Sequence, residues 1–411
     1  MTTALTPRRE LWLLATLAGI QFTHIVDFMV MMPLGPQFTQ LFRISDAQFG
    51  LLVSAYTFAA GASGLLASLY IDRFGRKKLL LSLYVLFGLA TLACGLAPTY
   101  DSLMAARIAA GAFGGVLSAL SQTIVADVIP FERRGRAMAL VMSSFSAATV
   151  AGVPLSLFLA AQWGWHAPFI AIAAVSGVLA AGAAFTMPPL KEHLARAPSS
   201  ALANIGLVLQ DRNHQKAFVF TALLMGAGFA VIPYITIYTT VNGGLTAQQI
   251  PYIYLCGGTA TLLTARWVGR MTDQLGKQTT FRRLVLVGML PMFLMTVSAP
   301  LGVWGMLAVS TTFFICMGGR MIPGMAIIGA AGNPQLRGTF MAINSSVQSA
   351  AMGVAAFVGG LVISRDANGL LQHYWGNALL GMAATVLSIW LVGKLSLYGA
   401  PGAPASVPVA K

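Results

Sequence analysis

Three polar residues near the N-terminus stand in an otherwise apolar stretch. Gln21, His24 and Asp27 are spaced three residues apart, so on a helix they share one face. A carboxylate in apolar surroundings can switch between a protonated and a charged form, and an adjacent imidazole can tune it or relay the proton. Two plainer readings remain: Asp27 is a static structural carboxylate, and His24 is a hydrogen-bonded structural histidine.

A second charged side chain lies within a later apolar run, in Arg107-Ile-Ala-Ala-Gly111-Ala-Phe-Gly114-Gly115. An arginine inside lipid is costly, so it should face a partner or a wet cavity unless its head snorkels to the surface. Counted from the same side of the two runs, Asp27 and Arg107 lie roughly 12 Å and 8 Å deep at 1.5 Å per residue. We therefore predict that Asp27 binds and releases protons, with Arg107 as its ion-pair partner.

Arg320 is the deep charge of the second half of the chain, in Cys316-Met-Gly-Gly319-Arg320-Met-Ile-Pro323. The apolar runs of that half contain no acidic residue. Three alternatives stay open for Arg320. It binds an anionic group of a substrate, it pairs with Asp27, or backbone carbonyls near Pro323 meet its charge.

Other side chains at comparable depth combine apolar bulk with polar tips, as in the wall of a small-molecule site. For the methionine and the aromatic residues alone, ordinary helix packing is the simpler reading. The predicted wall consists of Gln21, Met31, Tyr234, Tyr238, Asn344 and Gln348, together with Arg320.

The composition excludes an ordinary soluble protein. Of the 411 residues 57% are apolar and 9% are charged, and mean hydropathy is +0.77, whereas soluble domains carry roughly 25% charged residues. The net charge of +14 comes from bases in short segments between apolar runs, which favours lipid over nucleic acid as the partner. The three cysteines have no paired spacing, and no metal cluster or phosphate-binding loop is evident. We expect no cofactor, no metal and no enzymatic activity.

The apolar runs predict an all-α integral membrane protein with twelve transmembrane helices. One long polar connection, residues 188–215, divides them into lobes of six helices at 1–187 and 216–396, followed by a tail at 397–411. The expected spans are 11–35, 47–71, 78–98, 102–126, 136–161, 165–187, 216–241, 247–271, 283–300, 303–329, 338–364 and 374–396.

Lysine and arginine fix the expected orientation. They gather in the termini, the linker and the even-numbered connections, and the odd-numbered connections hold only Arg43 and Arg365. By the positive-inside rule both termini and the linker are cytoplasmic. We expect a multi-pass protein of the plasma (inner) membrane.

The two halves repeat one another. The loop Asp72-Arg73-Phe74-Gly75-Arg76 returns as Asp273-Gln-Leu-Gly276-Lys277 at a constant offset of 201 residues. A glycine here can adopt backbone conformations that a Cβ would resist, although a charge cluster that only sets topology would look similar. Two lobes in the same orientation are typical of transporters with parallel repeats, whose substrate path runs between the lobes.

This loop resembles the signature loop of the major facilitator superfamily, with Ser68 where that family usually has glycine. The resemblance implies a cytoplasmic latch that breaks and reforms as the lobes rock. The implied latch residues are Asp72, Arg73, Gly75, Arg76, Gly269, Asp273 and Gly276.

Two further motifs narrow the resemblance. The Arg107 motif is similar to fourth-helix motifs associated with proton coupling in antiporter members, and Ala151-Gly152-Val153-Pro154 resembles a shortened antiporter motif of drug-efflux members. Pro154 also removes one helical hydrogen bond and should kink its helix. The chain thus resembles bacterial twelve-helix drug and sugar efflux antiporters.

The resemblance implies a monomer that exchanges protons for a small organic or amphipathic compound by alternating access. Two alternatives remain: an importer or exchanger of an organic anion or lipid-like amphiphile that uses Arg320, and a non-transporting membrane receptor or scaffold.

Overall fold

The computed structural model describes residues 7–71, 74–129, 131–188, 190 and 201–398. These residues are almost entirely helical, with one short β-hairpin made of β1 (Ser364–Arg365) and β2 (Leu371–Gln372). They group into two compact units: unit 1 is Met1–Met31 with Phe58–Ser199, and unit 2 is Met32–Thr57 with Ser200–Lys411. The predicted division into lobes of six helices assigns residues 32–57 to the first lobe, whereas the contacts group them with unit 2.

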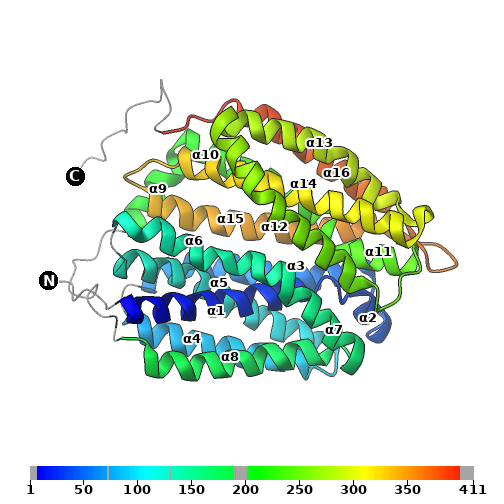
Figure 1. Ribbon diagram of the computed structural model, residues 1–411, viewed down its shortest axis with the longest axis horizontal. Coiled ribbons are helices and arrows are strands. Elements are labelled where there is room, and N and C mark those ends of the chain that lie inside the picture. Colours follow the sequence, from blue (N-terminus) through cyan, green and yellow to red (C-terminus); the bar gives the residue numbers. More distant parts are fainter. Residues whose placement is uncertain (1–6, 72–73, 130, 189, 191–200, 399–411) are drawn as a thin grey trace. The chain divides into compact units, whose positions relative to one another are not determined.

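The helices of the first half cover each of its predicted spans (Figure 1). They are α1 (Pro7–Val30), α2 (Gly35–Leu41), α3 (Asp46–Tyr70), α4 (Arg76–Gly95), α5 (Tyr100–Val128), α6 (Phe131–Ala147), the π-helix η2 (Ala148–Gly152), α7 (Val153–Trp163) and α8 (His166–Thr186).

The second half follows the same pattern after a short linker helix. Its helices are α9 (Ala201–Gln210), α10 (Arg212–Phe229), the 3-10 turn η4 (Ile232–Tyr234), α11 (Ile235–Val241), α12 (Ile250–Leu275), α13 (Lys277–Val297), the 3-10 turn η5 (Ala299–Leu301), α14 (Gly302–Ala331), α15 (Arg337–Val362) and α16 (Tyr374–Val392).

The predicted all-α membrane fold is confirmed. Of the described helical segments, eleven are long and apolar enough to cross a membrane. The remaining predicted span, 247–271, forms the 26-residue helix α12, which is more polar because it carries Arg266, Arg270 and Asp273. The first span was predicted too long: α1 ends at Val30, and residues 35–41 form the separate helix α2.

Within unit 1, α4 packs against α5 and α8, and α1 packs against α6 and α8. Helix α5 begins with a capping box in which Thr99 and Ser102 satisfy one another's backbone and side-chain groups. Further along α5, a Cβ at Gly115 would collide with the backbone of Ala60 on α3. Small residues therefore allow α3 and α5 to approach closely, as in other membrane helix pairs.

The fifth predicted span is interrupted where proline was expected to disturb it. A π-helical turn occupies Ala148–Gly152, and Pro154 lies in the first turn of α7. Proline cannot donate the backbone hydrogen bond that would continue α6, and a single π-turn is a common way to absorb that loss. A Cβ at Gly152 would collide with Val26 of α1. This glycine therefore allows the π-helical turn to pack directly against α1.

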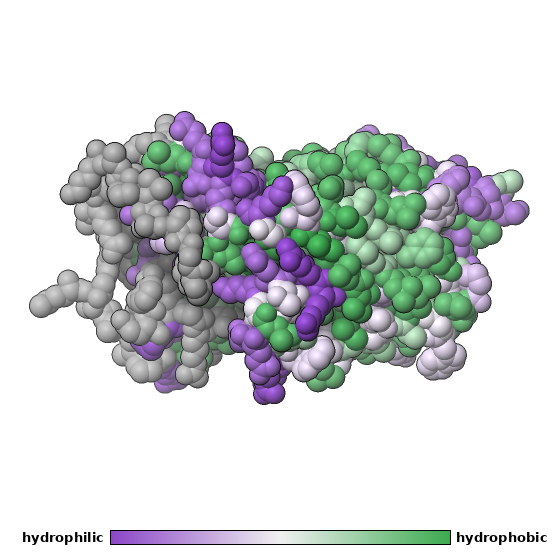
Figure 2. All heavy atoms as spheres, turned by 90° about the horizontal axis from the view of Figure 1, so that it is seen from above, coloured by the Kyte–Doolittle hydropathy of each residue, from purple (hydrophilic) through white to green (hydrophobic). Residues whose placement is uncertain are grey.

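Unit 2 has an aromatic centre between α10, α13 and α15. Phe220, Phe281 and Phe340 are fully buried there, and Phe220 meets Phe281 edge to face with ring centroids 5.0 Å apart. Helices α13 and α14 pack together, as do α12 and α14. On the outside, large apolar side chains such as Phe185, Leu263 and Trp304 are largely exposed. Figure 2 shows hydrophobic side chains over a broad part of the visible face, with clusters of hydrophilic ones on either side of it; a broad apolar band is expected of a surface that meets lipid.

Candidate functional site

The structure brings the two deep charges of the first half into direct contact. Asp27 on α1 and Arg107 on α5 form an ion pair of 2.9 Å between Oδ2 and Nη1, and neither side chain has any exposed surface. The same Nη1 also donates a longer hydrogen bond, 3.3 Å, to the backbone carbonyl of Asp27.

The surroundings of the pair are polar on one side only. Thr91 and Cys94 on α4, both fully buried, lie close enough to interact with Asp27 and Arg107 respectively. On the other side Val26 packs onto Gly152. The second carboxylate oxygen, Oδ1 of Asp27, accepts no hydrogen bond from any described residue. A proton placed on this oxygen would not displace Arg107, which is bonded to Oδ2.

His24 and Gln21 lie on the same helix as Asp27, one and two turns earlier. Gln21 donates a hydrogen bond of 3.3 Å from Nε2 to Ser118 Oγ on α5. The buried Nδ1 of His24 has no hydrogen-bond partner among the described residues, and no hydrogen bond between described residues joins His24 to Asp27. A relay through His24 stays a prediction.

Arg320 has different surroundings. It is 3% exposed on α14 and donates a hydrogen bond of 2.9 Å from Nη2 to the carbonyl of Leu224 on α10. No described carboxylate forms an ion pair with it, and its Nε has no partner among the described residues. The carbonyl acceptor lies on a neighbouring helix, and the Leu224 side chain packs where a Cβ on Gly324 would lie. The three alternatives for Arg320 stay predictions.

The other predicted wall residues are held in helix packing in this structure. Met31 and Tyr234 are fully buried, and Tyr234 donates a short hydrogen bond of 2.5 Å to the Ala356 carbonyl. The Tyr238 hydroxyl accepts the backbone N–H of Ala299 at 3.1 Å. Asn344 accepts a hydrogen bond of 2.6 Å from Thr221, and Gln348 is half-buried. Their role in substrate binding stays a prediction.

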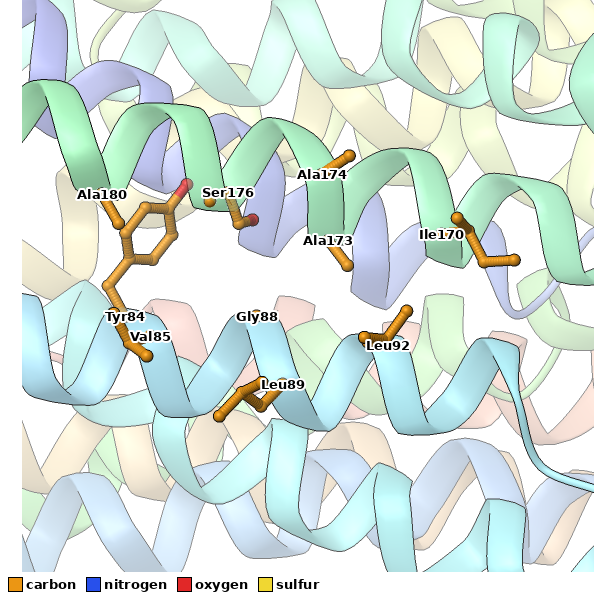
Figure 3. A pocket seen from close by; sticks show the side chains of 11 residues that line it. Tyr84, Val85, Gly88, Leu89, Leu92, Ile170, Ala173, Ala174, Ser176 and Ala180 are labelled. Atoms are coloured by element: carbon orange, nitrogen blue, oxygen red, sulfur yellow. The ribbon is translucent and has the colours of Figure 1, made fainter.

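A groove of about 330 Å³ between α4 and α8 is lined by none of the predicted substrate residues. Figure 3 shows the Tyr84 ring reaching from α4 toward α8, beside Ser176. The Tyr84 hydroxyl lies 2.9 Å from Thr23 Oγ1 on α1, so polar atoms continue from this groove to the helix that carries Asp27.

The structure describes only part of the predicted latch loop, because Asp72 and Arg73 lie outside the described residues. Arg76 is buried; its Nε pairs with Asp127 at 3.1 Å and its Nη1 donates to the Ile71 carbonyl at 2.8 Å. The sequence analysis missed Asp127, although an acid at the end of its span, close to three bases in the sequence, was a usable signal.

The glycines of the two loop copies differ. The expectation of an unusual backbone was wrong for Gly75, which has φ −61°, a value that any residue adopts. Gly276, in contrast, has φ 86°, where glycine is favoured. In the second copy Gly269 has open space beside it and Asp273 is exposed.

The sequence profile of the Major Facilitator Superfamily matches residues 17–356. This chain belongs to that superfamily. It is therefore a multi-pass membrane transporter rather than an enzyme.

Its relatives include efflux pumps. The chain is 28% identical over 307 residues to a chloramphenicol resistance protein of Streptomyces lividans, covering 71% of this chain and 73% of the relative. It is 24% identical over 358 residues to the chloramphenicol efflux pump Rv0191 of Mycobacterium tuberculosis, covering 85% and 83%. With the uncharacterized MFS-type transporter YceJ of Bacillus subtilis it shares 24% over 391 residues, covering 93% and 95%.

Solved structures of the same fold include a bacterial homolog of the human lysosomal transporter Spinster. Its TM-score is 0.74 at 13% identity, covering 95% of this chain and 97% of that one. The nucleoside transporter NupG also gives a TM-score of 0.74, at 12% identity, covering 94% and 99%. At these identities the likeness concerns the fold alone.

Proposed function

We propose that this superfamily member is a proton-coupled efflux antiporter that exports a small organic or amphipathic compound by alternating access. It lies in the bacterial inner membrane as a monomer in contact with lipid, with both termini and the linker cytoplasmic. The efflux pumps among its relatives support the direction, and the buried Asp27–Arg107 pair supports the coupling.

The Asp27–Arg107 pair is the single observation that carries the proposal. When Asp27 is charged, Oδ2 accepts from Arg107, and the pair is neutral inside its helical unit. When a proton arrives, Oδ1 offers a site with no hydrogen bond to break, and Arg107 keeps the Asp27 backbone carbonyl as an acceptor. Both protonation states leave the guanidinium hydrogen-bonded, but protonation leaves Arg107 without its opposite charge, so it is favoured only in a conformation that gives Arg107 water or another partner.

Substrate and proton would compete through this site. A compound bound while Asp27 is charged is released outward, and protonation of Asp27 from the outside resets the carrier. The loop residues Asp72, Arg73, Gly75, Arg76, Gly269, Asp273 and Gly276 would act as the cytoplasmic latch. In that latch the described Arg76–Asp127 pair is the contact to test by mutation.

Substrate-dependent proton movement in reconstituted vesicles tests the proposal. The native chain, Asp27→Asn and the matched control Asp101→Asn are compared over amphipathic cations, neutral compounds and organic anions. Asp101 is an exposed acid in the first turn of α5, so its loss should leave the flux intact. Flux that appears with one compound class and vanishes only in Asp27→Asn supports the antiporter. Transport that persists in Asp27→Asn with the proton flux unchanged contradicts it.

One observation favours a second candidate function. Arg320 is buried without an ion-pair partner among the described residues, and its Nε is unsatisfied. A carboxylate or other anionic group of a substrate would supply that acceptor, as in an organic-anion importer or exchanger. This candidate predicts that Arg320→Met abolishes anion transport and that transport survives collapse of the proton gradient.

A further inference from the structure

Helix α3 is continuous but belongs to both compact units. Its first half, Asp46–Thr57, groups with unit 2, and its second half, Phe58–Tyr70, groups with unit 1. An alternating-access carrier needs its parts to move against one another, so a helix shared in this way must release one set of contacts during the cycle. The contacts of the first half are the ones described next.

The first residue of α3 is fixed by a two-pronged ion pair. Asp46 accepts two hydrogen bonds of 2.8 Å from Arg365 of β1, one from Nε and one from Nη2. The Asp46 side chain is 4% exposed and that of Arg365 is 34% exposed, so water can reach only one partner freely. This geometry is among the strongest that a carboxylate and a guanidinium can make. The hydrogen bonds to Asp46 raise the pKa of Arg365, which keeps it charged at every physiological pH.

Below the ion pair, α3 and α15 touch through small residues. A Cβ at Gly360 would meet the Asp46 carbonyl at 2.6 Å, and a Cβ at Gly50 would meet the Ala356 carbonyl at 2.7 Å. One turn further, Ser54 donates a hydrogen bond of 2.6 Å to the Gly353 carbonyl. The interface is therefore closely packed, with the backbones of the two helices almost in contact.

The sequence sets these two charges apart. At the repeat offset of 201, Asp46 corresponds to Ala247, so the acid belongs to the first copy only. Arg365 is one of two bases in connections that otherwise lack them. The partner explains why a base stays on the side where the positive-inside rule disfavours it.

We infer that the Asp46–Arg365 ion pair is an outer latch, which holds the first half of α3 on α15 and the adjoining hairpin and breaks each time the outer end of the carrier opens. The inference rests on the alternating-access part of the proposed function. It does not depend on proton coupling.

Thiol labelling from the outside tests the latch. Ser54 is fully buried beneath the ion pair, so in a chain with Cys94, Cys256 and Cys316 replaced by alanine, Ser54→Cys should react slowly with a membrane-impermeant maleimide. Arg365→Gln and Asp46→Asn should each raise the labelling rate about tenfold, because they populate the open state more. The charge swap Asp46→Arg with Arg365→Asp should restore slow labelling.

Arg43→Gln is the matched control, since Arg43 is the other, exposed base of the outer connections and its loss should leave the rate unchanged. Size-exclusion chromatography establishes that each variant is folded, and Thr57→Cys serves as a second buried reporter. Unchanged labelling in Arg365→Gln, equal acceleration by Arg43→Gln, or a swap that stays fast would each overturn the latch. The assay uses no substrate and no proton gradient. The latch can therefore be supported even if the antiport proposal fails, and it can be overturned even if the antiport proposal holds.

Discussion

Each compact unit buries an arginine away from the ends of a membrane-spanning helix, Arg107 in unit 1 and Arg320 in unit 2, but the two arginines are compensated differently. Arg107 of unit 1 is paired with the carboxylate of Asp27, and both are fully buried. Arg320 of unit 2 has one backbone carbonyl as acceptor and no ion-pair partner among the described residues. The first site is neutral as a whole and can accept a proton, whereas the second stays positive and can accept only an anion or a polarised oxygen. In the two proposed functions, proton exchange would therefore take place in unit 1 and anion binding in unit 2.

The largest effect should follow from breaking the compensated pair. Arg107→Met leaves Asp27 as an uncompensated buried carboxylate, so the free energy of unfolding should fall by about 3–5 kcal/mol unless Asp27 protonates. Thermal unfolding of the native chain and of Arg107→Met in detergent measures this loss of stability.

The double variant Asp27→Leu with Arg107→Met separates charge from packing. It removes both charges together and should recover most of the lost stability while abolishing proton-linked transport. A double variant no more stable than Arg107→Met would show that the pair's geometry, rather than its charge balance, supports the fold.

The second-largest loss of stability should come from disturbing the close approach of α1 to the interrupted fifth span. Gly152→Ala places a methyl group against Val26, directly beside Asp27, and should cost about 1–3 kcal/mol of unfolding free energy. Gly182→Ala on α8 is its control because nothing lies within 4 Å of a Cβ there. Equal stability of the two variants would mean that α1 shifts away without penalty.

Single hydrogen bonds between helices should contribute less to the free energy of unfolding than the Gly152 contact does, and the two bonds compared next should contribute unequally. Thr221 donates to Asn344 at 2.6 Å in unit 2, whereas Gln21 donates to Ser118 at 3.3 Å in unit 1. Asn344→Ala should therefore cost about 0.6 kcal/mol, the average for such bonds in membrane helices, and Ser118→Ala should cost less. If the same unfolding assay showed a larger loss for Ser118→Ala than for Asn344→Ala, donor–acceptor distance would not be a guide to the strength of these hydrogen bonds.

The smallest effect on stability is expected at Arg320. Arg320→Met loses one hydrogen bond to a carbonyl but removes an unpaired buried charge, so the two contributions oppose one another and the net change in the free energy of unfolding should be close to zero. A loss as large as that of Arg107→Met would mean that Arg320 has a buried acidic partner. The comparison between the units would then no longer hold.

Much of the fold was readable from the sequence because lipid imposes one simple rule on every span. Each of the twelve predicted runs of apolar residues overlaps a described helical segment. Three local features were not readable in detail. These are the end of α1 at Val30, the π-turn at Ala148–Gly152 and the φ of Gly75, each of which depends on how neighbouring helices pack.

The candidate site shows where sequence reasoning succeeds. Asp27 and Arg107 could be matched because depth in a helix follows from counting residues. Contacts such as Asp46 with Arg365, 319 residues apart, depend on which helix ends meet, and no periodicity encodes that. Likewise, the sequence predicted Tyr234 and Tyr238 as part of a mixed apolar and polar wall, but it did not show that backbone groups would occupy both hydroxyls.

The central claim is that Asp27 couples transport to protons. The most direct test compares substrate exchange with uphill transport in vesicles that contain Asp27→Asn. If Asp27 couples transport to protons, the variant should exchange labelled substrate for unlabelled substrate at close to the native rate. It should fail to accumulate substrate against its gradient when a pH gradient is imposed. Accumulation at the native level by Asp27→Asn would contradict the account, because the buried carboxylate would then be a structural partner of Arg107 and nothing more.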